Sequence, residues 1–203
     1  MLGTSAGSWA AAATALNVSH DDLLQLEVPR FPNPRRGVLQ ESARQVFGAH
    51  TLSNVRVVVT EVPRLRRTVL SAATTPVSEL VAASSAVPGL LAPQRINGKS
   101  YVDGGVKSGC SVDLADAART LIVITPLAGA MFGPFGRFIE SRTDLEQAIW
   151  LERHGGKFIE FSPVRATADV AKLPQHLFDR PRAIEAYHRG YDEASSAVLP
   201  NTH

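Results

Sequence analysis

The spacing of apolar and polar residues predicts an alternation of helices and strands along the chain. Residues 6–16 hold six alanines in eleven positions, a composition that favours a helix. Residues 55–60 (VRVVVT) and 121–125 (LIVIT) are mostly β-branched runs with the length of a buried strand. Similar patterns predict further helices after Ser19, from Pro76, and over residues 41–47, 144–154 and 182–198, with further strands at 68–71, 95–102 and 158–161.

Two local signals sharpen this picture. Ser19 precedes Asp22 by three residues, just before a leucine-rich segment, which is the pattern of a helix N-terminal capping box. Asn97-Gly98 lies between alternating residues, which predicts a two-residue hairpin turn. Strands separated by helices imply an α/β fold whose sheet is mostly parallel.

Composition excludes several classes of protein. The chain has 203 residues, 44% of them apolar, and a net charge of +2, so it is neither disordered nor basic enough to bind nucleic acid by phosphate neutralisation. Cys110 is the single cysteine, which excludes an internal disulfide and a Cys-rich zinc site. No Lys or Arg precedes Arg30, and no apolar run reaches the roughly 20 residues of a membrane span. We therefore expect a cytoplasmic protein without a signal peptide or a transmembrane segment.

The first candidate for chemistry is a G-x-S-x-G motif at residues 3–7. Gly3 and Gly7 flank Ser5 and would permit a tight strand-to-helix turn that exposes the serine hydroxyl. At the start of the following helix, the backbone N–H of Ala6 is the nearest candidate donor to an oxyanion. The motif predicts a nucleophilic serine.

A serine hydroxyl needs a base, and Asp103 is the best candidate. It precedes Gly104 and Gly105 directly after the predicted hairpin, where two glycines let the backbone turn sharply and approach another segment. The alternative for this tripeptide by itself is a turn aspartate that caps its own backbone.

The GTSAGS segment and residues 83–113 together resemble the patatin-like phospholipases. The likeness is closest at ASSAVPGL and YVDGGV, and a less exact likeness runs from residue 3 to residue 123. The resemblance implies a three-layer α/β fold in a single domain over residues 1–203, with 124–203 as its C-terminal part. It also implies a lipid acyl hydrolase of the phospholipase, lysophospholipase or esterase type, without metal or cofactor. In that family's Ser-Asp dyad, Ser5 would form the acyl-enzyme and Asp103 would be its base.

The chain departs from this family at its start. Met1-Leu2 stand immediately before the motif, so the family's first strand and the Gly-rich loop that supplies most of its oxyanion hole are missing. We interpret this as an internal methionine read as the start, a fragment, or a shortened protein. Each lost oxyanion donor costs about 10²- to 10³-fold in rate, and lost strands would leave residues 55–59 on an unpaired apolar edge. We expect this chain alone to be poorly soluble or inactive, and a catalytically silent protein with a binding or regulatory role is the rival hypothesis.

Two other assignments stay open for the serine motif. One is a Ser-Asp-His triad of the α/β-hydrolase type, for which the chain offers six histidines: His20, His50, His154, His176, His188 and His203. The other is an anion cradle at a helix N-terminus, although no Walker-type lysine follows the glycines. No histidine pair has metal-ligand spacing, so the sequence predicts no metal site.

The expected partner is a lipid or phospholipid ester, with peripheral contact to a membrane surface and no nucleic acid. Two basic segments, Arg35-Arg36 and RLRR at residues 64–67, are candidates to attract anionic head groups, with solvated loops as the alternative. Residues 128–138 (AGAMFGPFGRF) form a candidate interfacial lid, with core-filling side chains as the alternative.

Overall fold

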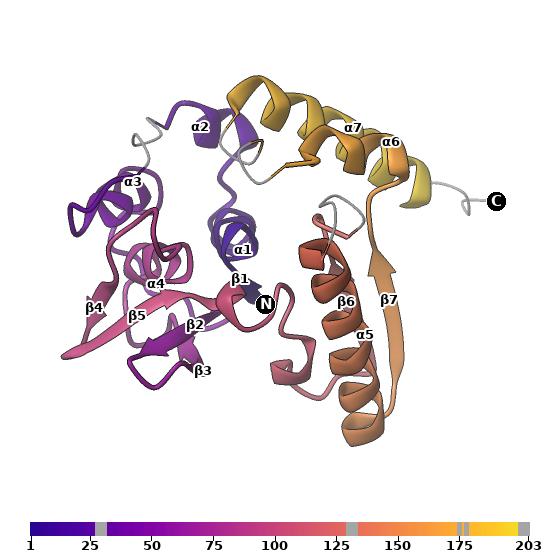
Figure 1. Cartoon of the computed structure of the whole chain (residues 1–203), viewed down its shortest axis with the longest axis horizontal. Coiled ribbons are helices and arrows are strands. Elements are labelled where there is room, and N and C mark those ends of the chain that lie inside the picture. Colours follow the sequence, from indigo (N-terminus) through magenta and orange to yellow (C-terminus); the bar gives the residue numbers. More distant parts are fainter. Residues whose placement is uncertain (27–31, 129–133, 174–175, 177–178, 199–203) are drawn as a thin grey trace. The chain divides into compact units, whose positions relative to one another are not determined.

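The computed structural model describes residues 1–26, 32–128, 134–173, 176 and 179–198 (Figure 1). The chain divides into two compact units, Met1–Ser111 and Val112–His203, which are described separately below. The assignment of residues 1–203 to a single domain stays a prediction.

The first unit is built on a five-stranded sheet. Its strands are β1 (Leu2–Thr4), β2 (Arg56–Val62), β3 (Arg66–Ser71), β4 (Gln94–Ile96) and β5 (Lys99–Asp103). They follow the order β1-β2-β5-β4, with β3 paired to β2.

Most strand pairs of this sheet are antiparallel. Only β1 and β2 run parallel, while β2 pairs with β3 and β5, and β4 with β5, in antiparallel fashion. The α/β class is confirmed, but the expectation of a mostly parallel sheet is wrong for this unit. The reason is local: short turns join β2 to β3 and β4 to β5, and a short turn can connect only antiparallel neighbours. The Asn97-Gly98 hairpin forms as predicted, with φ of 49° and 78° at its two residues.

The described residues of the first unit also form the α-helices α1 (Ala6–Leu16), α2 (His20–Leu24), α3 (Val38–Phe47) and α4 (Val77–Ser84). Helix α1 has the predicted bounds, and Asn17 ends it in the left-handed conformation. The capping box at the start of α2 is confirmed, because Ser19 and Asp22 each accept a hydrogen bond from the backbone of the other.

The core of this unit lies between one face of the sheet and a layer of helices. Val55, Val57 and Val59 face alanines of α1, Phe47 of α3 and Leu80 of α4 in one buried cluster. The valines between residues 55 and 59 are all fully buried, so the expectation of an unpaired edge there is wrong. The reason is that β3 pairs along one edge of β2, while β1 and β5 share the other edge.

The second unit holds a two-stranded parallel sheet and a long helix. Its main elements are β6 (Thr120–Ile124), α5 (Pro134–His154), β7 (Lys157–Phe161), α6 (Arg165–Ala168) and α7 (Arg180–Val198). Trp150 of α5 is fully buried, and its indole N–H donates to the Asp116 carbonyl at 3.1 Å. On β6, by contrast, Ile122 and Ile124 are 60% and 70% exposed.

Helix α5 differs from its prediction at one end. It begins at Pro134 instead of residue 144, so residues 134–138 of the expected lid lie in its first turns, while residues 129–133 lie outside the described residues. Within the described part of the chain, no helix has both the length and the apolar character that crossing a bilayer would require.

Candidate active site

Ser5 stands at a sharp turn between a strand and a helix. β1 ends at Thr4, α1 begins at Ala6, and Ser5 joins them with φ 51° and ψ −124°. A non-glycine residue with positive φ costs about 1–3 kcal/mol, so the surroundings must hold it there. The turn is tight enough that a Cβ on Gly3 would lie 2.5 Å from the Gly7 carbonyl oxygen, which explains a glycine at position 3.

The strand topology brings Asp103 to this turn. β1 and β5 share one edge of β2 and approach each other end to end: Thr4, the last residue of β1, pairs with Val58, and Asp103, the last of β5, pairs with Val59. Ser5 and Asp103 are therefore neighbours in space despite 98 intervening steps of sequence. The Ser5 hydroxyl donates a hydrogen bond to Asp103 Oδ2 at 2.7 Å.

The second carboxylate oxygen of Asp103 has a separate role. Oδ1 accepts the backbone N–H of Gly105 at 2.7 Å, which caps the short turn over Gly104–Val106. The capping expected of a turn aspartate is therefore present on Oδ1, while Oδ2 accepts from the Ser5 hydroxyl. Fixing Oδ1 in this way also fixes the direction in which Oδ2 faces the serine.

Asp103 is a buried carboxyl group, with 5% of its surface exposed. Burial raises the pKa of Asp103 above its ordinary value, and the hydrogen bonds from Ser5 and Gly105 offset only part of that rise. A raised pKa makes the ionised form a better proton acceptor.

Ser84, at the last turn of α4, fixes the backbone of the Ser5 turn. Its hydroxyl accepts the Ser5 N–H at 2.8 Å and donates to the Val58 carbonyl at 2.7 Å, and Ser84 is fully buried. One hydroxyl thus ties α4, the β2 backbone and the Ser5 turn together. Ser84 is not among the site residues predicted from the sequence. The available signal was a pair of serines at the end of a predicted helix, where neither has an evident role in helix formation.

A family model covers the segment that carries this geometry. The model for patatin-like phospholipase matches residues 1–116, more than half of the chain. The chain belongs to the patatin-like phospholipase family. Both Ser5 and Asp103 lie within the match, and the domains of this family are typically lipid acyl hydrolases. No curated protein matches the chain.

The glycines of the patatin-like motifs differ in what they accommodate. A Cβ on Gly104 would lie 2.5 Å from the Val58 carbonyl oxygen, and one on Gly105 would lie 2.9 Å from Asp103 Oδ1. A Cβ on Gly7 would meet no atom within 4 Å, so packing does not require glycine there. Gly7 is instead exposed at the start of α1, where the lack of a side chain leaves the space beside Ser5 open.

Ser8 supports the patatin-like serine turn from the helix side. Its hydroxyl and its backbone N–H both donate to the Ser5 carbonyl, at 2.6 and 2.8 Å. These bonds occupy the carbonyl of Ser5, while Ser84 occupies its N–H. The backbone of Ser5 is therefore held on both sides, which leaves the hydroxyl as its movable group.

The triad alternative requires a histidine bonded to Ser5 or Asp103. Among the described residues, no histidine forms a hydrogen bond with Ser5 or Asp103, and His203 lies outside that part of the chain. His154 instead packs against the ring of Trp150, and His176 accepts the Leu173 N–H. Over the same residues, no group of three metal-ligating side chains is placed to hold an ion.

Proposed function

We propose that Ser5 and Asp103 form a catalytic dyad that hydrolyses the carboxylic esters of lipids. The observation that carries this proposal is the direct 2.7 Å hydrogen bond from the Ser5 hydroxyl to Asp103 Oδ2. In a Ser-Asp-His triad the imidazole stands between the serine and the carboxylate, and here the carboxylate occupies the position of that base.

The proposed acylation step follows from this contact. Asp103 Oδ2 takes the hydroxyl proton while Ser5 Oγ attacks the ester carbonyl carbon, and the carbonyl oxygen becomes an oxyanion. The first N–H groups of a helix lack intrahelical acceptors, so the Ala6 N–H is a candidate donor to that oxyanion. Collapse of the tetrahedral intermediate breaks the bond to the alcohol, which leaves with the proton that Asp103 returns.

Deacylation uses the same carboxylate. Asp103 takes a proton from water, whose oxygen attacks the acyl carbon of the Ser5 ester. The second tetrahedral intermediate collapses to release the fatty acid, and Ser5 Oγ recovers its proton from Asp103. The cycle needs no metal or cofactor, and its substrates would be phospholipid, lysophospholipid or other lipid esters.

The direct test is labelling with a fluorophosphonate probe followed by intact mass measurement. We expect one adduct on the wild-type chain, none on Ser5→Ala, and full labelling of Ser53→Ala, a matched control at an exposed loop serine. Labelling of the Ser5→Ala chain would contradict the assignment of the nucleophile. A wild-type chain that is folded and takes no adduct would instead favour the catalytically silent protein.

Two further measurements complete the test. Hydrolysis of p-nitrophenyl butyrate, dispersed phosphatidylcholine and lysophosphatidylcholine would define the ester class. Replacing each of the six histidines by alanine in turn should leave labelling intact, because none is needed as the base; loss of labelling in one folded variant would support the triad.

A further inference from the structure

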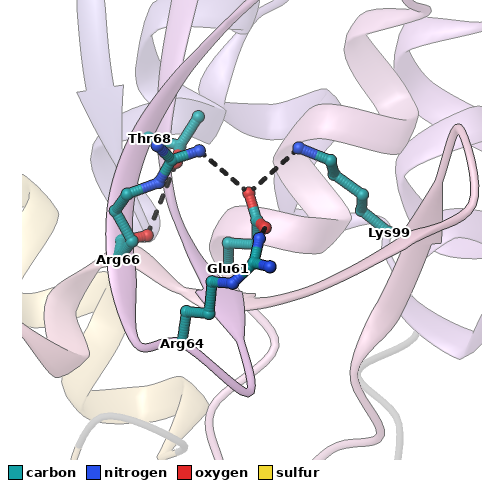
Figure 2. Close-up of polar contacts among 5 residues, drawn as sticks. All are labelled: Glu61, Arg64, Arg66, Thr68 and Lys99. Carbon is teal, nitrogen blue, oxygen red and sulfur yellow. Dashed lines mark hydrogen bonds and ion pairs between the residues drawn. The ribbon is translucent and has the colours of Figure 1, made fainter.

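Two hairpins of the first unit meet at a buried carboxylate (Figure 2). Glu61 lies near the end of β2, and only 6% of its side chain is exposed. Its Oε2 contacts Arg66 of β3 at 3.4 Å and Lys99 of β5 at 3.3 Å, and its Oε1 contacts Arg64 of the β2–β3 turn at 3.8 Å. Glu61 thus gathers three cations from two hairpins into one cluster.

This cluster has more positive than negative charge. Burial alone would raise the pKa of Glu61, but the hydrogen bonds and charges of Lys99 and Arg66 outweigh it and lower that pKa, so the carboxylate is ionised at neutral pH. One negative charge faces three positive charges, which leaves a surplus of two. The side chains of Arg64, Arg66 and Lys99 remain 78%, 63% and 53% exposed, so a partner in solution can reach them.

An apolar side chain stands between the two arginines. Leu65 occupies the tip of the β2–β3 turn with φ 49° and is 47% exposed. An exposed leucine flanked by exposed arginines suits the interface of an anionic bilayer, where cations meet phosphates and an apolar tip reaches the acyl boundary. A soluble anion has no apolar surface that Leu65 could contact.

The cluster lies further along β2 than the serine turn, which is level with the middle of that strand. β1 and β2 run parallel, and Thr4, just before Ser5, is level with Val58. Glu61 lies three residues further along β2, which at about 3.3 Å per residue is roughly 10 Å beyond that level. The cluster is therefore displaced from the serine turn by roughly 10 Å along the strand direction.

We propose that Arg64, Leu65, Arg66 and Lys99 form a docking surface for an anionic lipid bilayer, here called the basic hairpin surface. As the means by which a lipid substrate reaches Ser5, this proposal rests on the proposed function. Docking itself needs no catalysis, so the two can be tested separately.

The test measures co-sedimentation of the Ser5→Ala chain with vesicles, because that variant leaves the lipids intact. We expect binding to phosphatidylcholine vesicles that contain phosphatidylglycerol, little binding to pure phosphatidylcholine, and weaker binding as salt rises. Each basic residue near an anionic surface contributes about fivefold to partitioning, so Arg64→Gln/Arg66→Gln should bind about 25-fold more weakly. Lys99 stays beside Glu61 in this variant, which preserves one ion pair of the cluster.

The matched control removes the same charge elsewhere. Arg44 and Arg165 are exposed and lie outside both basic segments, and Arg44→Gln/Arg165→Gln should retain most of the binding. Equal losses in the two double variants would overturn the proposal, because net charge alone would then explain binding. Equal binding to neutral and anionic vesicles would also overturn it.

Two further measurements distinguish bilayer docking from a discrete phosphate site and from the proposed dyad. Displacement from vesicles by inorganic phosphate at constant ionic strength would indicate a discrete phosphate site and overturn the docking surface. In a chain that retains Ser5, the Arg64→Gln/Arg66→Gln substitutions should leave fluorophosphonate labelling of Ser5 unchanged. Vesicle binding in a chain that the probe never labels would refute the dyad and leave the basic hairpin surface standing.

Discussion

Replacing Ser84 by alanine is the sharpest perturbation that the site offers. The hydroxyl of Ser84 links the Ser5 N–H to the Val58 carbonyl and forms no hydrogen bond with Asp103. The change deletes one oxygen atom and adds none. We expect Ser84→Ala to lower both the free energy of unfolding and the reactivity of Ser5.

The magnitude follows from the two groups left behind. Ser84 is fully buried, so the Ser5 N–H and the Val58 carbonyl lose their partner out of reach of bulk water. A buried polar group without a partner costs about 1–3 kcal/mol, which gives about 2–6 kcal/mol for the pair. The space of one oxygen atom is too small to admit a replacement water.

The effect on reactivity has a separate origin. Ser5 holds a positive φ of 51°, and its N–H bond to Ser84 is one of the contacts that keep it there. Relaxation of the turn would move Oγ from Asp103. If the lost restraint is worth about 1.4–2.7 kcal/mol, the rate of fluorophosphonate labelling falls about 10- to 100-fold.

Urea unfolding and the labelling rate should be measured on Ser84→Ala beside Ser85→Ala. Ser85 is the adjacent serine and accepts the Trp9 indole N–H at 3.0 Å, but it does not contact Ser5. Its variant should lose about 0.5–1.5 kcal/mol and label at the wild-type rate. A loss below about 0.5 kcal/mol in Ser84→Ala, together with unchanged labelling, would refute the reasoning.

Three further predictions concern other parts of the chain. Burial raises the folded-state pKa of Asp103 above 3.8, so the ionised carboxylate lowers the free energy of unfolding at neutral pH, and this loss is recovered as pH falls through the raised pKa. Asp103→Asn should therefore abolish labelling and unfold at a higher urea concentration than wild type at neutral pH. In acid the difference in stability should disappear. Gly104→Ala should lower the free energy of unfolding by about 1–3 kcal/mol, because its Cβ would lie 2.5 Å from a β2 carbonyl oxygen. Gly7→Ala, whose Cβ meets no atom, should change the free energy of unfolding by less than about 1 kcal/mol. Ile122→Thr/Ile124→Thr should reduce dye binding to exposed apolar surface and light scattering without loss of stability; unchanged values would show that these isoleucines are covered in solution.

Local signals in the sequence predicted the elements well, and the errors arose where local signals were absent. The alanine run gave both ends of α1, and Asn97-Gly98 gave the β4–β5 turn, because each depends on nearby backbone preferences. The first ten residues of α5 contain Gly136 and no clear apolar periodicity, so the pattern placed the helix start too late. Strand pairing was misjudged because the alternation of strands and helices was read as a parallel sheet, although the short β2–β3 and β4–β5 turns make those two pairs antiparallel.

The same limit explains why the Ser5–Asp103 contact was predictable and the contribution of Ser84 was not. Ser5 and Asp103 each carry a glycine-marked local motif, whereas Ser84 matters only because the end of α4 lies over β2. The distance within the dyad depends on how β5 registers against β2, and a slip of one residue would move Asp103 by about 3.3 Å and turn its side chain to the other face. Gly104, the next residue, permits the close approach to the Val58 carbonyl that accompanies this register. The glycine after the aspartate therefore acts on the geometry of the dyad through strand register, so its substitution should disturb reactivity as well as stability.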